Sequence, residues 1–111
     1  DFCRFVEQVA QGLGYEVTVC DEPLHAIASY ERSRPTDIVL DVIMPDVEGV
    51  QIVRELAQRG SQARIVLVSG YDPWFIDLGR TLGEASGLGR IECLTKPVKL
   101  DRLRAVLRDR P

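Results

Sequence analysis

The hydrophobic and polar positions of this chain follow two patterns that alternate along the sequence. Apolar residues at helical spacing (Phe2, Val6, Val9 and Leu13) predict a first helix that ends at Gly14. Short apolar runs between polar residues predict strands. In chain order, the expected elements are that first helix, a strand over 15–20, a helix opened by Pro23, a strand over 38–40, and a helix over about 50–58 that ends near Gly60. They continue with a strand over 65–68, a helix opened by Asp72 and Pro73, a strand over 91–94, and a last helix that carries Leu100, Leu103 and Val106.

This alternation predicts an α/β fold, a doubly wound parallel sheet with helices on both faces. The continuous apolar runs at 38–40 and 65–68 fit strands that are covered on both sides. An open sheet of this kind binds its ligand at the carboxyl ends of the strands. Because the pattern begins with a helix where such a sheet begins with a strand, we expect the first strand to lie upstream of Asp1.

Composition narrows the class of protein. The 111 residues are 45% hydrophobic and 28% charged, which fits one globular domain. A net charge of −3 argues against a general nucleic-acid or membrane surface, and no apolar stretch is long enough to span a membrane. Cys3, Cys20 and Cys93 form no CxxC pair, which favours reduced thiols in the cytoplasm over disulfides or a zinc site. We expect Cys20 and Cys93 in the core, and the single histidine, His25, at the surface.

Three polar residues follow successive predicted strands. Asp41, Ser69 and Lys96 come at strand ends that meet at one edge of a parallel sheet. An aspartate in such a place is, taken alone, most often a turn residue or a helix cap. The combination points to chemistry, because a carboxylate can attack a phosphoryl group, and a hydroxyl and a cation can stabilise the charge on the product.

The residues around these positions resemble the receiver domains of two-component response regulators. The resemblance rests on "DVIMPDVEG", which starts at Asp41, on "VLVSG", which contains Ser69, and on "LTKP" at 94–97. Together with the order of elements it covers the chain from Asp1 to Arg110. It implies a flavodoxin-like fold and a single receiver domain over 1–111 that is a fragment of a longer regulator.

The resemblance also implies a role for each site residue. Asp41 would accept the phosphoryl group, Lys96 would pair with that group, and Ser69 would move toward it. Pro97 would make the preceding peptide bond cis and so aim the lysine. Asp41 and the backbone carbonyl of Ile43 would bind Mg²⁺.

The chain departs from the family pattern in three places. The acidic pair that supplies the remaining metal ligands is expected upstream of Asp1. Cys93 occupies the switch position, where receivers usually carry an aromatic residue. The segment over 70–90 is longer than usual and rich in glycine, which is typical of a broken helix.

We therefore expect a phosphoacceptor switch rather than an enzyme. A histidine kinase or a phosphotransfer protein would phosphorylate Asp41, and the face formed by Ser69 and 70–90 would change its affinity for a partner. The output domain or effector would lie outside this chain. The partners that fit this function include a second copy of the chain in a homodimer, and we expect no direct contact with nucleic acid or membrane. The alternative is a pseudo-receiver that acts as a protein docking module. A phosphohydrolase fits poorly, because Ile43 stands where a second acid is needed.

Overall fold

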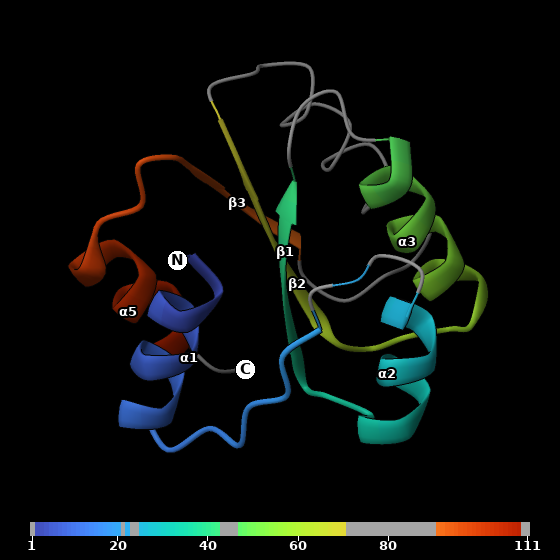
Figure 1. The fold of residues 1–111 in the computed structure, drawn as a ribbon, viewed down its shortest axis with the longest axis horizontal. Helices are drawn as coiled ribbons and strands as arrows, with labels where there is room; N and C mark the ends of the chain where they lie inside the picture. Colours follow the sequence, from blue (N-terminus) through green and yellow to red (C-terminus); the bar gives the residue numbers. More distant parts are fainter. Residues whose placement is uncertain (1, 21, 23–24, 43–46, 71–90, 110–111) are drawn as a thin grey trace. The chain divides into compact units, whose positions relative to one another are not determined.

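The computed structural model describes residues 2–20, 22, 25–42, 47–70 and 91–109 (Figure 1). Helices and strands alternate over most of this part of the chain, as the sequence predicts. The elements are α1 (Phe2–Gly12), α2 (Ala26–Ser33), β1 (Asp37–Val42), α3 (Val47–Gln58), β2 (Arg64–Ser69), β3 (Ile91–Thr95) and α5 (Leu100–Arg108). The expected helix opened by Asp72 and Pro73 lies outside the described residues.

The described strands form one parallel sheet in the order β1-β2-β3. The register pairs Asp41 with Val68 and Val68 with Leu94, so the carboxyl ends of the strands lie together. Every residue of the middle strand β2 is buried, as expected for an apolar strand of a parallel sheet. The predicted parallel α/β arrangement is therefore confirmed.

The chain divides into two compact units, and the sheet belongs to the unit Glu22–Lys96. Helices α2 and α3 contact each other, and α3 contacts β1. Side chains alternate between the two faces of a strand, so one face of the sheet carries every second residue. The core of this unit packs α3 against that face through Ile52, Val53, Leu56, Ile65 and Leu67, with Ile27, Tyr30, Ile38, Leu40, Ile91 and Cys93 around them.

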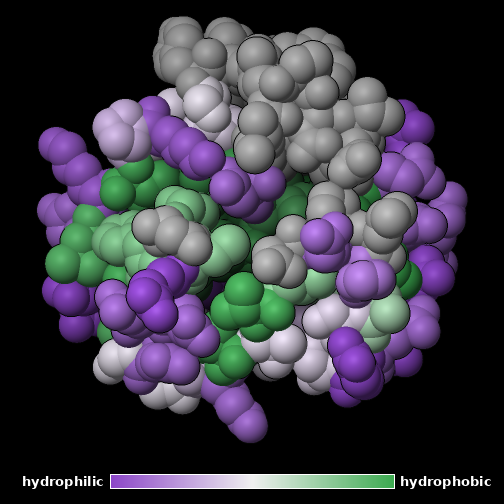
Figure 2. Space-filling view, viewed as in Figure 1, coloured by the Kyte–Doolittle hydropathy of each residue, from purple (hydrophilic) through white to green (hydrophobic). Residues whose placement is uncertain are grey.

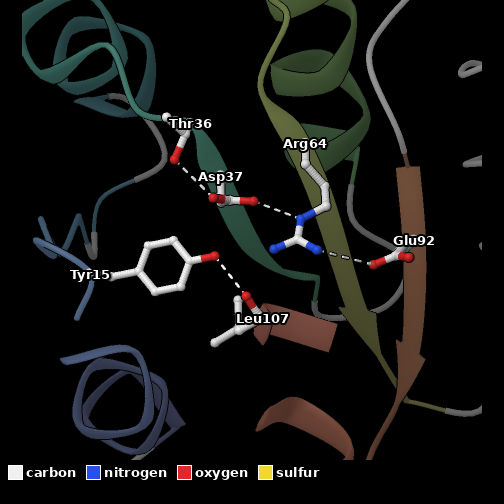
Figure 3. A network of polar contacts seen from close by, with 6 residues as sticks. All are labelled: Tyr15, Thr36, Asp37, Arg64, Glu92 and Leu107. Carbon is white, nitrogen blue, oxygen red and sulfur yellow. Dashed lines mark hydrogen bonds and ion pairs between the residues drawn. The ribbon is translucent and has the colours of Figure 1, made fainter. Parts of the chain in front are cut away.

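The other unit joins the two ends of the chain, Asp1–Asp21 and Pro97–Pro111. Helix α1 contacts α5, and each buries two residues: Val9 and Ala10 on α1, Leu103 and Leu107 on α5. The hydroxyl of Tyr15 donates a hydrogen bond of 2.7 Å to the carbonyl of Leu107 (Figure 3). This bond links the chain after α1 to the end of α5.

Two helices end where the sequence places a glycine. At the end of α1, the Tyr15 amide bonds to the Ala10 carbonyl and the Gly14 amide to the Gln11 carbonyl, both at 3.0 Å. This pair of bonds is a Schellman motif, and Gly14 supplies the left-handed residue with a φ of 91°. Gly60, with a φ of 69°, ends α3 through the same two bonds. Both helix ends confirm the prediction from the sequence.

The predicted strand over 15–20 is wrong. This segment has no regular secondary structure, although Tyr15 and Val17 are partly buried and Glu16 and Thr18 exposed, as in a strand. In the flavodoxin-like order the second strand pairs with the first strand alone, and no strand precedes α1 among the described residues. Alternation of buried and exposed side chains is therefore not enough to make this segment a strand, because no neighbouring strand accepts its backbone hydrogen bonds among the described residues. Cys20 is exposed, which also corrects its expected place in the core.

Two helix faces also differ from expectation. Leu100 is 45% exposed, because it is the first residue of α5, where a side chain has no preceding turn to cover. Leu103 is fully buried as predicted. In the short helix α2, Ile27 packs on the core as expected, whereas the neighbouring Ala28 is exposed.

Hydrophilic residues are interspersed with hydrophobic ones over the surface that Figure 2 presents. Arg59, which directly follows α3, forms an exposed ion pair of 2.8 Å with Glu31 of α2, and this hydrogen bond raises the pKa of the Arg59 guanidinium. Exposed pairs of this kind add little stability. His25 is exposed, as predicted. None of the described helices is long and apolar enough to cross a bilayer.

Candidate functional site

The candidate site lies at the carboxyl edge of the sheet, where Asp41 and Lys96 meet. Asp41 is the last residue but one of β1, and Lys96 directly follows β3. The Lys96 Nζ atom lies 2.7 Å from Oδ1 of Asp41. Parallel neighbours are about 4.8 Å apart, so β1 and β3 are separated by about 10 Å. The lysine side chain therefore reaches across the middle strand to the carboxylate.

The alternation of the strands explains why these two side chains can meet. The register pairs Asp41 with Val68 and Val68 with Leu94, so all three side chains lie on one face of the sheet. Lys96, two residues after Leu94, is directed to the same face. The sequence-based expectation that Asp41 and Lys96 lie together is met by the geometry.

The Asp41–Lys96 pair is partly shielded from solvent. The side chains are 27% and 35% exposed. The Oδ1 atom of Asp41 is itself buried, and the ammonium lies against it in an ion pair outside the angles of a hydrogen bond. Partial burial lowers the local dielectric and so strengthens the attraction. The Lys96 ammonium therefore lies against one oxygen of the Asp41 carboxylate, Oδ1.

Ser69 reaches the site through its backbone. It is the last residue of β2 and is 6% exposed. The Lys96 amide donates a hydrogen bond of 2.7 Å to the Ser69 carbonyl, which fixes the chain at the base of the lysine. Because side chains alternate along β2, the Ser69 hydroxyl lies on the opposite face from Asp41. A phosphoryl contact from this hydroxyl requires the chain after β2 to move.

A magnesium site at this edge would receive one side-chain ligand from the described residues. The Asp41 carboxylate is the kind of oxygen donor that Mg²⁺ takes in proteins. Ile43, whose carbonyl is the second expected ligand, lies outside the described residues. Within the described part of the chain, no group of three or more His, Cys, Asp or Glu side chains could hold a metal ion. The described residues thus fit part of such a site and do not complete it.

Two other predicted site residues lie near this edge. Cys93 on β3 is partly buried and packs against the core cluster beside α3, as expected for a small apolar residue. Its role at the switch position stays a prediction. Pro97 follows the lysine and is exposed, and the cis form of its peptide bond also stays a prediction. Residues 71–90 lie outside the described part of the chain.

Sequence reasoning missed a second charged cluster, at the amino ends of the strands (Figure 3). Arg64, the first residue of β2, is buried with 3% of its side chain exposed. Its Nε atom donates to Oδ1 of Asp37 at 2.6 Å, and its Nη1 atom lies 3.8 Å from Oε2 of Glu92. The signal was present in the sequence, because each of the three strands starts with a charged residue in its first two positions.

Comparison with known proteins agrees with this arrangement. The response regulator receiver domain family matches residues 1–108. Response regulator MprA of Mycobacterium leprae is 31% identical over 101 residues, which cover 86% of this chain and 41% of that protein. Transcriptional regulatory protein TrcR of Mycobacterium tuberculosis is 30% identical over 95 residues, which cover 86% of this chain and 35% of that protein. The chain thus spans less than half the length of these two relatives.

Solved structures show the same fold. A response regulator from Colwellia psychrerythraea superposes with a TM-score of 0.81 at 29% identity, over 96% of this chain and 85% of that chain. Chemotaxis protein CheY4 of Vibrio cholerae superposes with a TM-score of 0.78 at 23% identity, over 96% of this chain and 87% of that chain. Because this second structure is only 23% identical, its similarity to the chain concerns the fold alone.

Proposed function

Because this chain belongs to the family of response regulator receiver domains, we propose that it is a two-component phosphoacceptor switch and that Asp41 is the acceptor. The observation that carries this assignment is the ion pair of 2.7 Å between Asp41 and Lys96 at the carboxyl edge of the sheet. It joins a nucleophile to a cation at the place where open α/β sheets bind their ligands.

In the proposed reaction, a carboxylate oxygen of Asp41 attacks the phosphorus of a phosphohistidine or a small acyl phosphate. A bond from that oxygen to phosphorus forms, and the bond from phosphorus to the donor breaks. The electron pair leaves with the donor, and the product is an aspartyl phosphate. The Lys96 ammonium would lie beside the phosphoryl oxygens and offset their negative charge. It would thereby stabilise both the transition state and the product.

Mg²⁺ belongs to the proposal as a cofactor that Asp41 and the Ile43 carbonyl would help to hold. When bound, it supplies positive charge that neutralises the phosphoryl oxygens. The acidic residues expected ahead of Asp1 would complete its ligands.

The signal would leave the site through Ser69. Movement of its hydroxyl toward the phosphoryl group would displace the chain after β2 and change the face formed by Ser69 and 70–90. A histidine kinase or phosphotransfer protein would be the donor, and an output domain or effector outside this chain the receiver of the signal. We place this exchange in the cytoplasm, and a homodimer is one form that the phosphorylated protein would be free to take.

The test is intact-protein mass after incubation with acetyl phosphate and Mg²⁺. We expect the mass of one phosphoryl group on the parent and none on Asp41→Asn. Asp101→Asn, a substitution at an exposed aspartate of α5, is the matched control and should gain mass like the parent. No gain in any of them, with the upstream strand present, would contradict the switch.

The second candidate, a docking module that is not phosphorylated, has two observations in its favour. The described residues supply a single carboxylate toward the metal, and Cys93 stands at the switch position. Failure of phosphorylation in a folded protein would select this candidate.

A further inference from the structure

The buried cluster at the amino ends of the strands links all three strands of the described sheet. Arg64 on β2 donates to Asp37 on β1 at 2.6 Å and lies 3.8 Å from Glu92 on β3. The Thr36 hydroxyl donates to the other oxygen of Asp37 at 2.8 Å. Figure 3 shows the guanidinium between the two carboxylates. The cluster therefore ties both outer strands to the side chain of the middle one.

This cluster and the candidate site lie on the same strands and on the same face. Asp37 precedes Asp41 by four residues on β1. Glu92 on β3 precedes Lys96, which directly follows that strand, by four residues. An even spacing keeps side chains on one face, and four residues of strand span about 13 Å. Each outer strand thus contributes one carboxylate to the cluster and one partner to the Asp41–Lys96 pair.

Asp41 and Lys96 come from strands that are not hydrogen-bonded to each other. Among the described strands, each outer strand pairs with β2 alone. Neighbouring strands are rotated by roughly 20–25°, and this twist can vary by 10° or more in either direction. The distance between Asp41 and Lys96 therefore depends on the twist accumulated over two strand pairs. A rigid guanidinium held between the two outer strands at their other end limits that twist.

The charges of the cluster favour one geometry. Arg64 is almost fully buried, and the Oε2 atom of Glu92 is buried with the guanidinium as its ion-pair partner. A buried charge that loses its partner is strongly destabilising, so arrangements that separate these groups are disfavoured. A buried ion pair contributes little net stability relative to uncharged side chains of similar size, so stability alone does not explain this cluster.

We propose that Arg64 is a positioning residue that holds Asp41 and Lys96 at reacting distance through Asp37 and Glu92. This inference rests on the proposed function for its consequence, which is the rate of phosphorylation. The geometry itself is testable without phosphorylation, because the chain contains only two lysines, Lys96 and Lys99.

The first readout is acetylation of lysine by acetic anhydride, measured by tandem mass spectrometry as the ratio of Lys96 to Lys99. The reagent must reach the amine nitrogen, so a lysine whose Nζ atom is held 2.7 Å from a carboxylate oxygen reacts slowly. Lys99 is exposed and serves as the internal reference. Asp41→Asn defines the ratio for a lysine that has lost its carboxylate.

The variant that tests the proposal is Asp37→Asn/Arg64→Met/Glu92→Gln, which removes the charges together and leaves none buried without a partner. In this variant, confirmed as folded by its urea unfolding transition, we expect the ratio to rise toward that of Asp41→Asn. Arg59→Met, which removes an arginine from an exposed ion pair, should leave the ratio unchanged. A ratio equal to the parent's in the folded triple variant would overturn the proposal.

Arg64→Lys keeps the test decisive if the triple variant does not fold. A lysine has one ammonium and cannot span both carboxylates as a guanidinium does. We expect a ratio between those of the parent and Asp41→Asn, and a ratio equal to the parent's would overturn the proposal here too.

The second readout is the rate of phosphorylation by acetyl phosphate and Mg²⁺. We expect it to fall about tenfold in the triple variant, because misplacement by a fraction of an ångström slows a transfer reaction. If the parent itself accepts no phosphoryl group, the proposed function fails. The ratio of Lys96 to Lys99 acetylation still tests the positioning role of Arg64 in that case. If the parent is phosphorylated and the triple variant reacts equally fast, the positioning role fails and the proposed function stands.

Discussion

The Lys96 ammonium lies 2.7 Å from the Asp41 carboxylate although their strands are separated by the middle strand of the sheet. A carboxylate alone repels a phosphoryl donor, because both carry negative charge. The ammonium offsets part of that repulsion and is close enough to contact the phosphoryl oxygens once they are transferred. In the proposed reaction, this relationship would make the rate of phosphorylation depend on Lys96.

Replacing Lys96 by methionine should slow phosphorylation of Asp41 by about a hundredfold, the typical effect of removing one group that stabilises transition-state charge. Methionine keeps the length of the side chain and removes the charge. The measurement is the initial rate of mass gain with acetyl phosphate and Mg²⁺.

Lys99→Met is the matched control, because it removes the other lysine of the chain at an exposed position. Its rate should equal the parent's. Equal losses in both variants would mean that net charge, rather than the Asp41–Lys96 contact, sets the rate.

Two glycines near the end of α1 should respond in opposite ways to alanine. Gly14 has a φ of 91°, which an L-residue adopts at a cost, so Gly14→Ala should lower the free energy of unfolding by about 1 kcal/mol. Gly12 is the last residue of the helix, and a Cβ added there would lie in open space, so Gly12→Ala should raise the free energy of unfolding by about 0.5 kcal/mol.

Urea unfolding followed by circular dichroism measures both changes. Open space also surrounds Gly14, so backbone conformation is the only difference that the pair tests. Destabilisation of similar size in both variants would argue against the left-handed helix end.

Much of the site could be predicted from the sequence because its geometry follows from strand order. Parallel strands bring their carboxyl ends together, so Asp41 and Lys96 at two such ends meet without any further information. Helix ends at Gly14 and Gly60 were also predictable, since glycine is the residue that a left-handed helix end favours.

The sequence was less informative where structure depends on a neighbour. The segment over 15–20 has the alternation of a strand, but a strand forms only when another strand accepts its hydrogen bonds. The burial of Arg64 had the same kind of cause, because an arginine is rarely buried without a partner, and its partners here, Asp37 and Glu92, come from the two neighbouring strands. The sequence of β2 alone, without its neighbouring strands, predicts a surface position for Arg64.

The hydroxyl of Tyr15 should contribute measurably to the unit that contains both ends of the chain. Tyr15→Phe removes a partly buried hydrogen bond of 2.7 Å to the Leu107 carbonyl and should lower the free energy of unfolding by about 1 kcal/mol. The urea midpoint is the measurement, with Tyr30→Phe as the control. The Tyr30 hydroxyl makes no hydrogen bond within the described part of the chain, so its loss should change stability little. Equal stability of Tyr15→Phe and the parent would contradict the assigned bond.

Removal of Mg²⁺ should slow phosphorylation by about tenfold or more, since a divalent cation at the phosphoryl group stabilises charge that Lys96 alone offsets only in part. The rate is compared in the presence of EDTA and of EDTA saturated with Mg²⁺, using the protein with its upstream strand. An equal rate in both would remove Mg²⁺ from the proposed function and leave Asp41 as the acceptor.

The most direct test of the account is to identify the phosphorylated residue. Borohydride reduces an aspartyl phosphate to homoserine with release of phosphate, so the acceptor keeps a permanent mark after treatment with acetyl phosphate and Mg²⁺. Tandem mass spectrometry then reads the position of the mark. Our account predicts homoserine at residue 41 in the parent and none in Asp41→Asn. Homoserine at a different acidic residue, or none anywhere in a folded protein, would contradict it.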